Sequence, residues 1–206
     1  MLAVVAALAG LWRYRQLAPP LRPVALLAGF DVAAELTSAV LVSRITSNLF
    51  LLPAILAGEA LLLTLAYRRA LASPQLRRVL LAVLGAFLVF LASQAWLKLG
   101  LVRYFAAAQV VYNLYVLGLA GLYYRQLLHE LHVARLSHDP LFWLSTGLMV
   151  YALGNLLIGL SGDYVLTHYS LPVQRLVLLG VRNLFNITLY LAYITTLWMR
   201  PPKPSS

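Results

Sequence analysis

Blocks of about twenty apolar residues, separated by short arginine-rich stretches, recur along this chain. A helix rises about 1.5 Å per residue, so each block is long enough to cross the roughly 30 Å hydrocarbon core of a bilayer. Apolar residues make up 62% of the chain and charged residues 11%, a composition that water would not solvate as a soluble domain. The pattern predicts an all-α, polytopic integral membrane helical bundle.

We predict seven transmembrane helices in a single domain over residues 1–200, followed by a short cytoplasmic tail, 201–206. The expected spans are 2–15, 24–42, 46–67, 79–99, 104–126, 140–160 and 177–199. The first span is the shortest, and it crosses the membrane if Arg13 and Arg15 extend to the headgroups or if translation starts upstream. A signal peptide is the alternative for this segment, but its positive charges would precede the apolar run instead of following it.

Lysine and arginine concentrate in alternate connections, which indicates the cytoplasmic side. The connections 1–2, 3–4 and 5–6 and the tail hold Arg13, Arg15, Arg22, Arg68, Arg69, Arg77, Arg78, Arg125, Arg135, Arg200 and Lys203. The other connections hold Arg44, Lys98, Arg103 and Arg175. We therefore predict an N-terminus outside, a C-terminus in the cytoplasm, and a multi-pass protein of the inner (cytoplasmic) membrane. This topology accounts for the net charge of +10, and no basic stripe interleaved with aromatic residues supports binding of nucleic acid.

Local signals predict particular helix ends and packing contacts. Asp139 and Pro140 are typical of an N-cap followed by the first helical position. Pro53 is expected to kink the third span. Two pairs of small residues, Ala54 with Gly58 and Gly118 with Gly121, are candidates for close helix packing.

Ionisable and amide side chains inside the spans are the candidate functional residues, because such groups are costly in a bilayer. Asp31 and Glu35 are four residues apart and share a face of the second span. Counting about 1.5 Å per residue from the outer ends places most of the set in the outer half of the bundle, as an outward-facing polar pocket. The expected ligand-binding residues are Asp31, Glu35, Glu59, Asn113, Asn155, Arg182 and Asn186. Their depths also predict an ion pair between Arg182 and Glu35.

The same residues have a purely structural alternative, since membrane helices use polar side chains for interhelical hydrogen bonds without any ligand. Away from the ends of the spans, three acids, Asp31, Glu35 and Glu59, stand against one arginine, Arg182. This surplus of acids exceeds what packing needs, and it favours a site for a ligand, a proton or a cation.

Several kinds of cofactor and catalytic site are not supported by the residues. The chain has no cysteine, and the last span, 177–199, has no lysine that could hold retinal. His129 and His132 are three apart, where a zinc-protease helix needs its histidines four apart. No glycine-rich phosphate loop and no G-x-S-x-G motif occur. We therefore predict no cofactor, no metal site and no catalytic residue, which favours a protein that is not an enzyme but does not decide the question.

Two segments, SNLFLLPAILAGEALLL at 47–63 and HDPLFWLSTGLMVYALGNLLIGL at 138–160, resemble an uncharacterised family of small bacterial polytopic membrane proteins. Some relatives in that family resemble the sensor modules of signalling kinases. The resemblance implies a sensor module without a kinase domain of its own, and it carries over no catalytic residue.

The leading hypothesis is a ligand-binding or sensory seven-helix module. Its expected partners are membrane lipids, a small-molecule or lipid ligand, and a signalling protein, with no nucleic acid. The first alternative is a small proton- or cation-coupled transporter that uses Asp31, Glu35 and Glu59 as a relay. The second is an intramembrane lipid-modifying enzyme.

Overall fold

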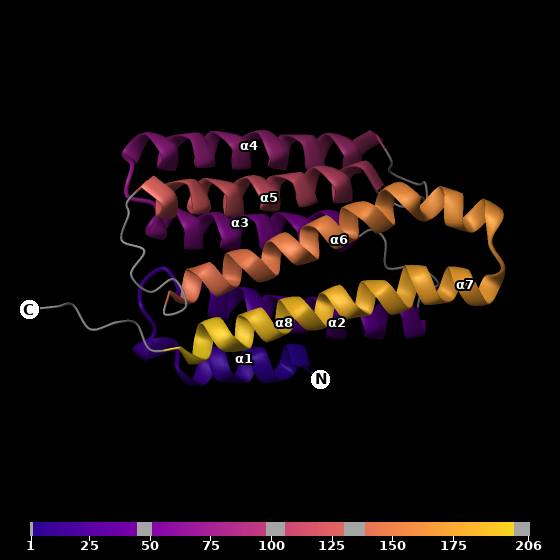
Figure 1. Cartoon of the computed structure of the whole chain (residues 1–206), viewed down its shortest axis with the longest axis horizontal. Coiled ribbons are helices and arrows are strands. Elements are labelled where there is room, and N and C mark those ends of the chain that lie inside the picture. The colour runs from indigo at the N-terminus through magenta and orange to yellow at the C-terminus, as the bar shows by residue number, and fades with distance from the viewer. Residues whose placement is uncertain (1, 45–50, 98–105, 130–138, 200–206) are drawn as a thin grey trace, which may run out of the picture. The chain divides into compact units, whose positions relative to one another are not determined.

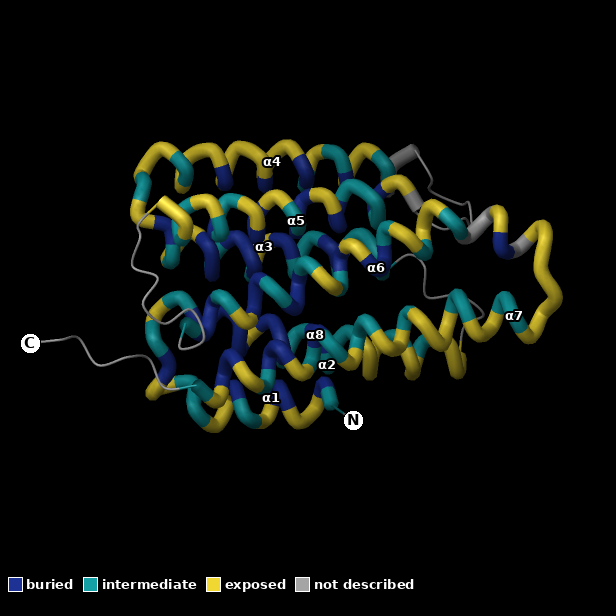
Figure 2. Tube along the Cα trace, viewed as in Figure 1, coloured by how far each residue is buried: buried dark blue, intermediate teal, exposed yellow. Residues whose placement is uncertain are grey.

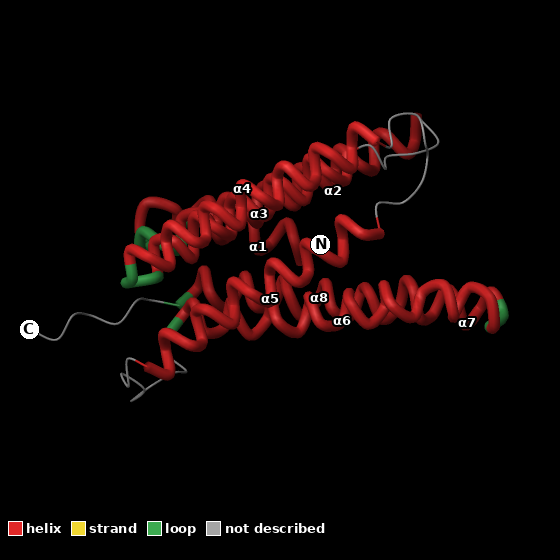
Figure 3. Tube along the Cα trace, turned by 90° about the horizontal axis from the view of Figure 1, so that it is seen from above, coloured by secondary structure: helices red, strands yellow, loops and turns green. Residues whose placement is uncertain are grey.

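The computed structural model describes residues 2–44, 51–97, 106–129 and 139–199. Its regular structure is helical, with no β-strand among these residues (Figures 1 and 3). The chain divides into two compact units, Ala3–Tyr112 and Asn113–Ser206. The prediction of an all-α protein is confirmed.

The first unit contains five helical elements and the beginning of a sixth. They are α1 (Leu2–Trp12), the 3₁₀ helix η1 (Tyr14–Gln16), α2 (Arg22–Arg44), α3 (Leu52–Ala70), α4 (Pro74–Leu97) and the first turns of α5 (Ala106–His129). Helix α3 packs against both α2 and α4. Nη1 of Arg69, at the end of α3, donates a 3.0 Å hydrogen bond to the carbonyl of Pro19, which precedes α2. The α1–α2 and α3–α4 connections therefore lie at the same end of this unit, and α2 and α3 run antiparallel.

Large apolar side chains cover much of the exposed surface of the helices. Helix α4 buries a stripe at helical spacing, and its other faces are largely exposed (Figure 2). The buried stripe consists of Leu80, Leu84, Phe87 and Leu91, whereas Val79, Leu81, Val83 and Val89 are exposed. A soluble bundle turns such side chains inward, so these faces are suited to contact with lipid.

Within the described part of the chain, four helical segments are long and apolar enough to cross a membrane. They are Arg22–Arg44, Pro74–Gln94, Pro140–Ser161 and Leu171–Trp198. Helix α1 is apolar but has only 11 residues, about 16 Å of helix. These lengths and compositions indicate a helical membrane protein.

The second unit is built on an antiparallel pair formed by α6 (Pro140–His168) and α8 (Arg182–Trp198). Before α8 come α7 (Leu171–Arg175) and η4 (Leu176–Val181), a π-helical segment. The residues at both junctions keep right-handed helical dihedrals, so α7, η4 and α8 continue one another. The Thr196 hydroxyl donates a 3.1 Å hydrogen bond to the Pro140 carbonyl and joins the end of α8 to the start of α6.

Glycines allow α6 and α8 to approach closely. A Cβ atom at Gly147 would overlap the side chain of Ala192, and one at Gly154 would overlap the ring of Phe185. These two glycines lie two turns apart on one face of α6. Neither glycine was predicted to be a packing residue. The predicted pair, Gly118 and Gly121, is wrong, because both are exposed and no neighbouring atom lies within 4 Å of where their Cβ atoms would stand.

The start of α6 has the predicted N-cap. An Asp139 carboxylate oxygen accepts a 3.0 Å hydrogen bond from the backbone N–H of Leu141, and Pro140 occupies the first turn. The Tyr123 hydroxyl of α5 donates a hydrogen bond to the other oxygen of the same carboxylate. Asp139 therefore joins α5 to α6 within the second unit, in addition to capping the helix.

Several helix boundaries differ from the predicted spans. Pro53 was expected to kink the outer half of the third span, but it lies in the first turn of α3, where a proline fits because the backbone N–H has no partner to lose. Residues 45–50, which include the predicted start of this span, lie outside the described residues. Helix α4 begins at Pro74 and takes in Arg77 and Arg78. The predicted outer loop between the last two spans is largely helical, with only Tyr169 and Ser170 between α6 and α7.

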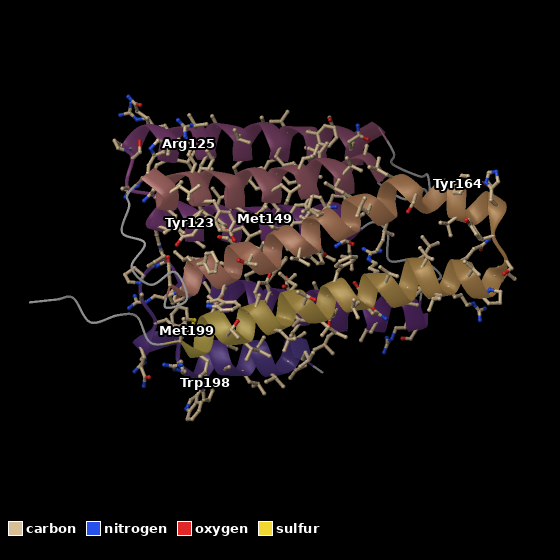
Figure 4. The ribbon with its side chains drawn as sticks, viewed as in Figure 1. Tyr123, Arg125, Met149, Tyr164, Trp198 and Met199 are labelled. Carbon is tan, nitrogen blue, oxygen red and sulfur yellow. The ribbon has the colours of Figure 1, made fainter. Side chains whose placement is uncertain are left out.

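Aromatic residues mark both ends of the apolar part of α6. The helix has 29 residues, about 43 Å, which is longer than a hydrocarbon core of about 30 Å. About 32 Å of helix separates Trp143 from Tyr164. The ring of Tyr164 stacks on His168 at 4.3 Å, and it lies at the end of this unit opposite to Tyr123 and Trp198 (Figure 4). Since aromatic rings favour the membrane interface, we expect the hydrocarbon core to cover α6 between Trp143 and Tyr164.

A valine at Gly154 should destabilise the second unit, because its side chain would overlap the ring of Phe185. We expect Gly154→Val to lower the free energy of unfolding by about 1–3 kcal/mol, the usual range for overpacking. Unfolding of the purified protein in mixed micelles would measure this. The matched control is Gly159→Val on the same helix, where the added side chain meets open space. Equal effects of the two substitutions would contradict the close approach of α6 and α8.

Candidate acidic site in the first unit

A contact between Phe30 and Gly58 sets the register of α2 and α3. A Cβ atom at Gly58 would overlap the Phe30 ring, so the absence of a side chain lets the ring lie against α3. Asp31 and Glu59 are the next residues on the two helices, and the contact brings both to the same level. The prediction that Gly58 is a packing residue is thereby supported, whereas its proposed companion Ala54 is exposed.

Asp31 is a buried acid with an unsatisfied oxygen. Its residue surface is 9% exposed, and its Oδ1 atom has no hydrogen-bond partner among the described residues. The charges that act on it come from Glu59 and Glu35, which are both negative when ionised. Hydrocarbon cannot solvate a lone carboxylate, so an ionised Asp31 would be destabilised unless a proton or a positively charged group binds to it.

Tyr112 connects α5 to the same site. Its side chain is hydrogen-bonded to Glu59. Its ring lies 6.2 Å from that of Phe87 on α4, with the planes tilted by 38°. Four helices of the first unit thus contribute to the site: α2 through Asp31, α3 through Glu59, α4 through Phe87 and α5 through Tyr112. The sequence analysis missed Tyr112, although a tyrosine in the middle of a span, away from the interfaces, was a usable signal.

Glu35 lies one turn beyond Asp31 on α2 and is exposed. The buried residues of α2 are Pro23, Val24, Ala25, Leu27, Ala28 and Asp31, so Asp31 is the last buried residue of the helix. Electrostatic interaction between Glu35 and Asp31 agrees with the prediction that the two acids share a face. The acids therefore lead from an exposed position at Glu35 to a buried one at Asp31.

Repulsion limits the charge that this group of acids can carry. Two ionised carboxylates in a medium of low dielectric repel each other and both lose their hydration. The Tyr112 side chain is hydrogen-bonded to Glu59, while Asp31 Oδ1 has no hydrogen-bond partner among the described residues. The geometry thus suits a pair of carboxyl groups that holds a proton or another cation between them.

Asn113 follows Tyr112 on α5 and is also unsatisfied. It is 1% exposed, and neither its amide oxygen nor its amide nitrogen has a hydrogen-bond partner among the described residues. A buried amide normally makes several hydrogen bonds. Asn113 was predicted from the sequence as a candidate binding residue. It is therefore a second polar group that the described residues leave without hydrogen bonds.

Asn113 is the first residue of the second unit, and the remaining predicted residues also belong to that unit. Asn155 is buried, and its Nδ2 donates a 3.0 Å hydrogen bond to the Tyr151 carbonyl of its own helix, which supports a structural role. The contact between Gly154 and Phe185 brings Asn155 to the level of the first turns of α8, where Arg182 and Asn186 are half-buried. The predicted ion pair of Arg182 with Glu35 joins residues of different units, and it stays a prediction.

A π-helical segment immediately precedes Arg182, and nothing in the sequence pattern indicated it. Residues Leu176–Val181 follow i→i+5 hydrogen bonding, which widens the helix and changes the direction of the side chains on either side. Such segments often occur near functional positions.

The described residues contain no group of three or more His, Cys, Asp or Glu side chains that could hold a metal ion. His129 ends α5, whereas His132 and His138 lie outside the described residues.

Removal of the Tyr112 hydroxyl should matter only while Glu59 can accept its hydrogen bond. In a double-mutant cycle of Tyr112→Phe and Glu59→Gln, we expect a coupling of about 0.5–2 kcal/mol in the free energy of unfolding. The control cycle pairs Tyr112→Phe with Thr37→Val, an exposed residue that bonds to the Ala33 carbonyl of its own helix, and it should be additive. Additive effects in both cycles would contradict the Tyr112–Glu59 hydrogen bond.

No protein-family model, no curated protein and no solved structure matches this chain. The resemblance of 47–63 and 138–160 to small bacterial membrane proteins therefore stays a hypothesis. What the protein does has to be argued from its own side chains.

Proposed function

We propose that this protein is a sensory module of the cytoplasmic membrane that binds a small, positively charged ligand through Asp31 and Glu59. Glu35 would take part as the exposed acid at the mouth of the site. The observation that carries this proposal is the buried Oδ1 atom of Asp31, which has no hydrogen-bond partner and lies beside a second acid. A cation would supply the missing partner and cancel the repulsion between the carboxylates.

The proposal includes seven spans with the N-terminus outside. Helices α3 and α5 have 19 and 24 residues, about 28 and 36 Å, lengths that suit spans in addition to the four most apolar segments. The hydrogen bond between Arg69 and Pro19 holds the α1–α2 and α3–α4 connections at one end of the first unit. Both connections are rich in arginine, which supports a cytoplasmic location for that end and contact with anionic headgroups.

A proton- or cation-coupled carrier is the second candidate function. It is favoured by the succession of acids from exposed Glu35 to buried Asp31 and on to Glu59, which resembles a path for a cation. Carriers built from inverted repeats have interrupted helices in matching pairs. Among the described helices a π-helical interruption occurs only in the last one, which favours the sensory proposal.

Thermal unfolding in lipid nanodiscs would test the charge of the ligand. We would titrate sodium, choline and putrescine as chloride salts, with sodium gluconate as the control for the anion. One of these cations is expected to raise the Tm of the wild-type protein in a saturable way. At a cation concentration of a hundred times the Kd, the free energy of unfolding should increase by about 2.7 kcal/mol. The shift should vanish in Asp31→Asn and persist in Thr37→Val.

An equal shift in Asp31→Asn, or no saturable shift with any of the three cations, would contradict the proposal. The active cation would then be offered to proteoliposomes. Uptake that depends on Asp31 would show that the protein is a carrier and overturn the sensory proposal, whereas binding without uptake would support the sensory proposal.

A further inference from the structure

The end of the first unit that holds the α1–α2 and α3–α4 connections is strongly basic. Its arginines are Arg13, Arg15, Arg22, Arg68, Arg69, Arg77 and Arg78. Residues 1–112 contain three acids, and the two nearest to this end are Asp31 and Glu59. Asp31 lies nine residues along α2 from Arg22, and Glu59 lies ten residues before Arg69 on α3, which are distances of about 14 and 15 Å. No carboxylate of the unit therefore balances the charge of this end.

Two of these arginines donate hydrogen bonds to the same connection from different helices. Nη1 of Arg69, at the end of α3, bonds to the carbonyl of Pro19. Nε of Arg22, at the start of α2, donates a 3.3 Å hydrogen bond to the carbonyl of Leu17. Leu17 and Pro19 are two residues apart, and two residues of chain span at most about 7 Å. The two guanidinium groups are therefore attached to one short stretch of backbone.

The connections that hold these arginines are themselves fixed by buried side chains. Leu17 and Leu21 of the α1–α2 connection are 4% and 2% exposed, and Leu71, which follows α3, is 1% exposed. The carbonyl of Leu71 accepts a 2.7 Å hydrogen bond from Nε of Arg77, at the start of α4. Packing of the connections thus keeps the accepting carbonyls in place, and with them the three guanidinium groups.

Each anchored guanidinium still has donors for an anion. An arginine side chain has five N–H donors in a planar fork that matches two oxygens of a phosphate. In Arg69 the bonded atom is Nη1, which leaves the edge formed by Nε and Nη2, and in Arg22 it is Nε, which leaves the edge formed by the two Nη atoms. Because the side chains are already ordered, binding an anion costs less conformational entropy than it would for free arginines.

Trp12 indicates that this end lies at a membrane surface. It is the last residue of α1, directly before the basic connection, and it is 82% exposed. Exposed tryptophans favour the level between the headgroups and the acyl chains. Leu8 and Leu11 are also exposed on α1 and suit contact with acyl chains. The arginines that follow Trp12 would then lie at the level of the lipid phosphates.

We propose that the α1–α2 and α3–α4 connections form a site for the phosphate of one anionic phospholipid, which Arg22 and Arg69 bind and the charge of Arg77 supports. The excess of positive charge selects an anionic headgroup over a zwitterionic one, whose own cation the arginines repel. The site is separate from the pair of acids, Asp31 and Glu59. Lipid binding can therefore fail while cation binding stands, and cation binding can fail while lipid binding stands.

Native mass spectrometry of the full-length protein in detergent would test this site by counting bound lipids. The protein would be titrated with phosphatidylglycerol or with phosphatidylcholine. We expect the first phosphatidylglycerol to bind the wild-type protein about tenfold more tightly than the first phosphatidylcholine. Arg69→Gln should weaken the binding of phosphatidylglycerol by about tenfold or more, the effect of losing a hydrogen bond to a charged group, and leave that of phosphatidylcholine unchanged.

Arg68→Gln is the matched control, because it removes the same charge from the neighbouring exposed residue of α3. It should weaken the binding of phosphatidylglycerol by at most about fivefold, the size expected for an exposed charge. Equal losses in Arg68→Gln and Arg69→Gln would contradict an anchored site and leave only general attraction by charge.

The wild-type protein alone keeps the proposal testable if Arg69→Gln does not fold. Equal affinities of the wild-type protein for the two lipids would overturn the proposal. Inorganic phosphate, added at constant ionic strength, should leave the first phosphatidylglycerol bound. Displacement of that lipid by inorganic phosphate would assign the site to a free anion and would also overturn the proposal.

Discussion

The need of polar groups for partners in hydrocarbon shapes the whole chain. Helices satisfy the backbone, and many of the small hydroxyl side chains bond to carbonyls of their own helices, as Thr64 does to Ala60 at 2.6 Å and Thr146 does to Phe142 at 2.8 Å. Thr196 instead bonds to the Pro140 carbonyl of a neighbouring helix. Against this background, a buried carboxyl oxygen without a donor at Asp31 is exceptional, and the proposed site follows from that exception.

Close contacts at glycines decide which side chains meet. In the first unit the Phe30 ring lies against Gly58 and brings Asp31 level with Glu59, and in the second unit Gly154 receives the ring of Phe185. Lipid provides no hydrophobic force between helices, so such tight contacts carry much of the packing energy. They also make the sites sensitive to distant changes, because a side chain at Gly58 would shift the two acids relative to each other.

Sequence patterns were sufficient for the helices and for the identity of the acids, but not for their neighbours. The long apolar blocks, the Asp139 N-cap and the shared face of Asp31 and Glu35 all follow from spacing along one helix. Tyr112 and the packing glycines depend on contacts between helices, which spacing along one helix does not reveal. The ends of the helices could not be predicted accurately for a different reason: a helix such as α6 continues beyond the apolar block that identifies it.

The acids and Asn155 of the predicted pocket now have different interpretations. Asn155 donates to its own helix, and this is enough to explain a buried amide there. An asparagine or a glutamine could serve the same structural role at 31 or 59 without the cost of a charge. Carboxyl groups at both positions add repulsion that packing does not require, and Tyr112 is hydrogen-bonded to one of them. A pair that is costly to keep and unequal in its hydrogen bonding is better explained by binding and release of a positive charge than by stability alone.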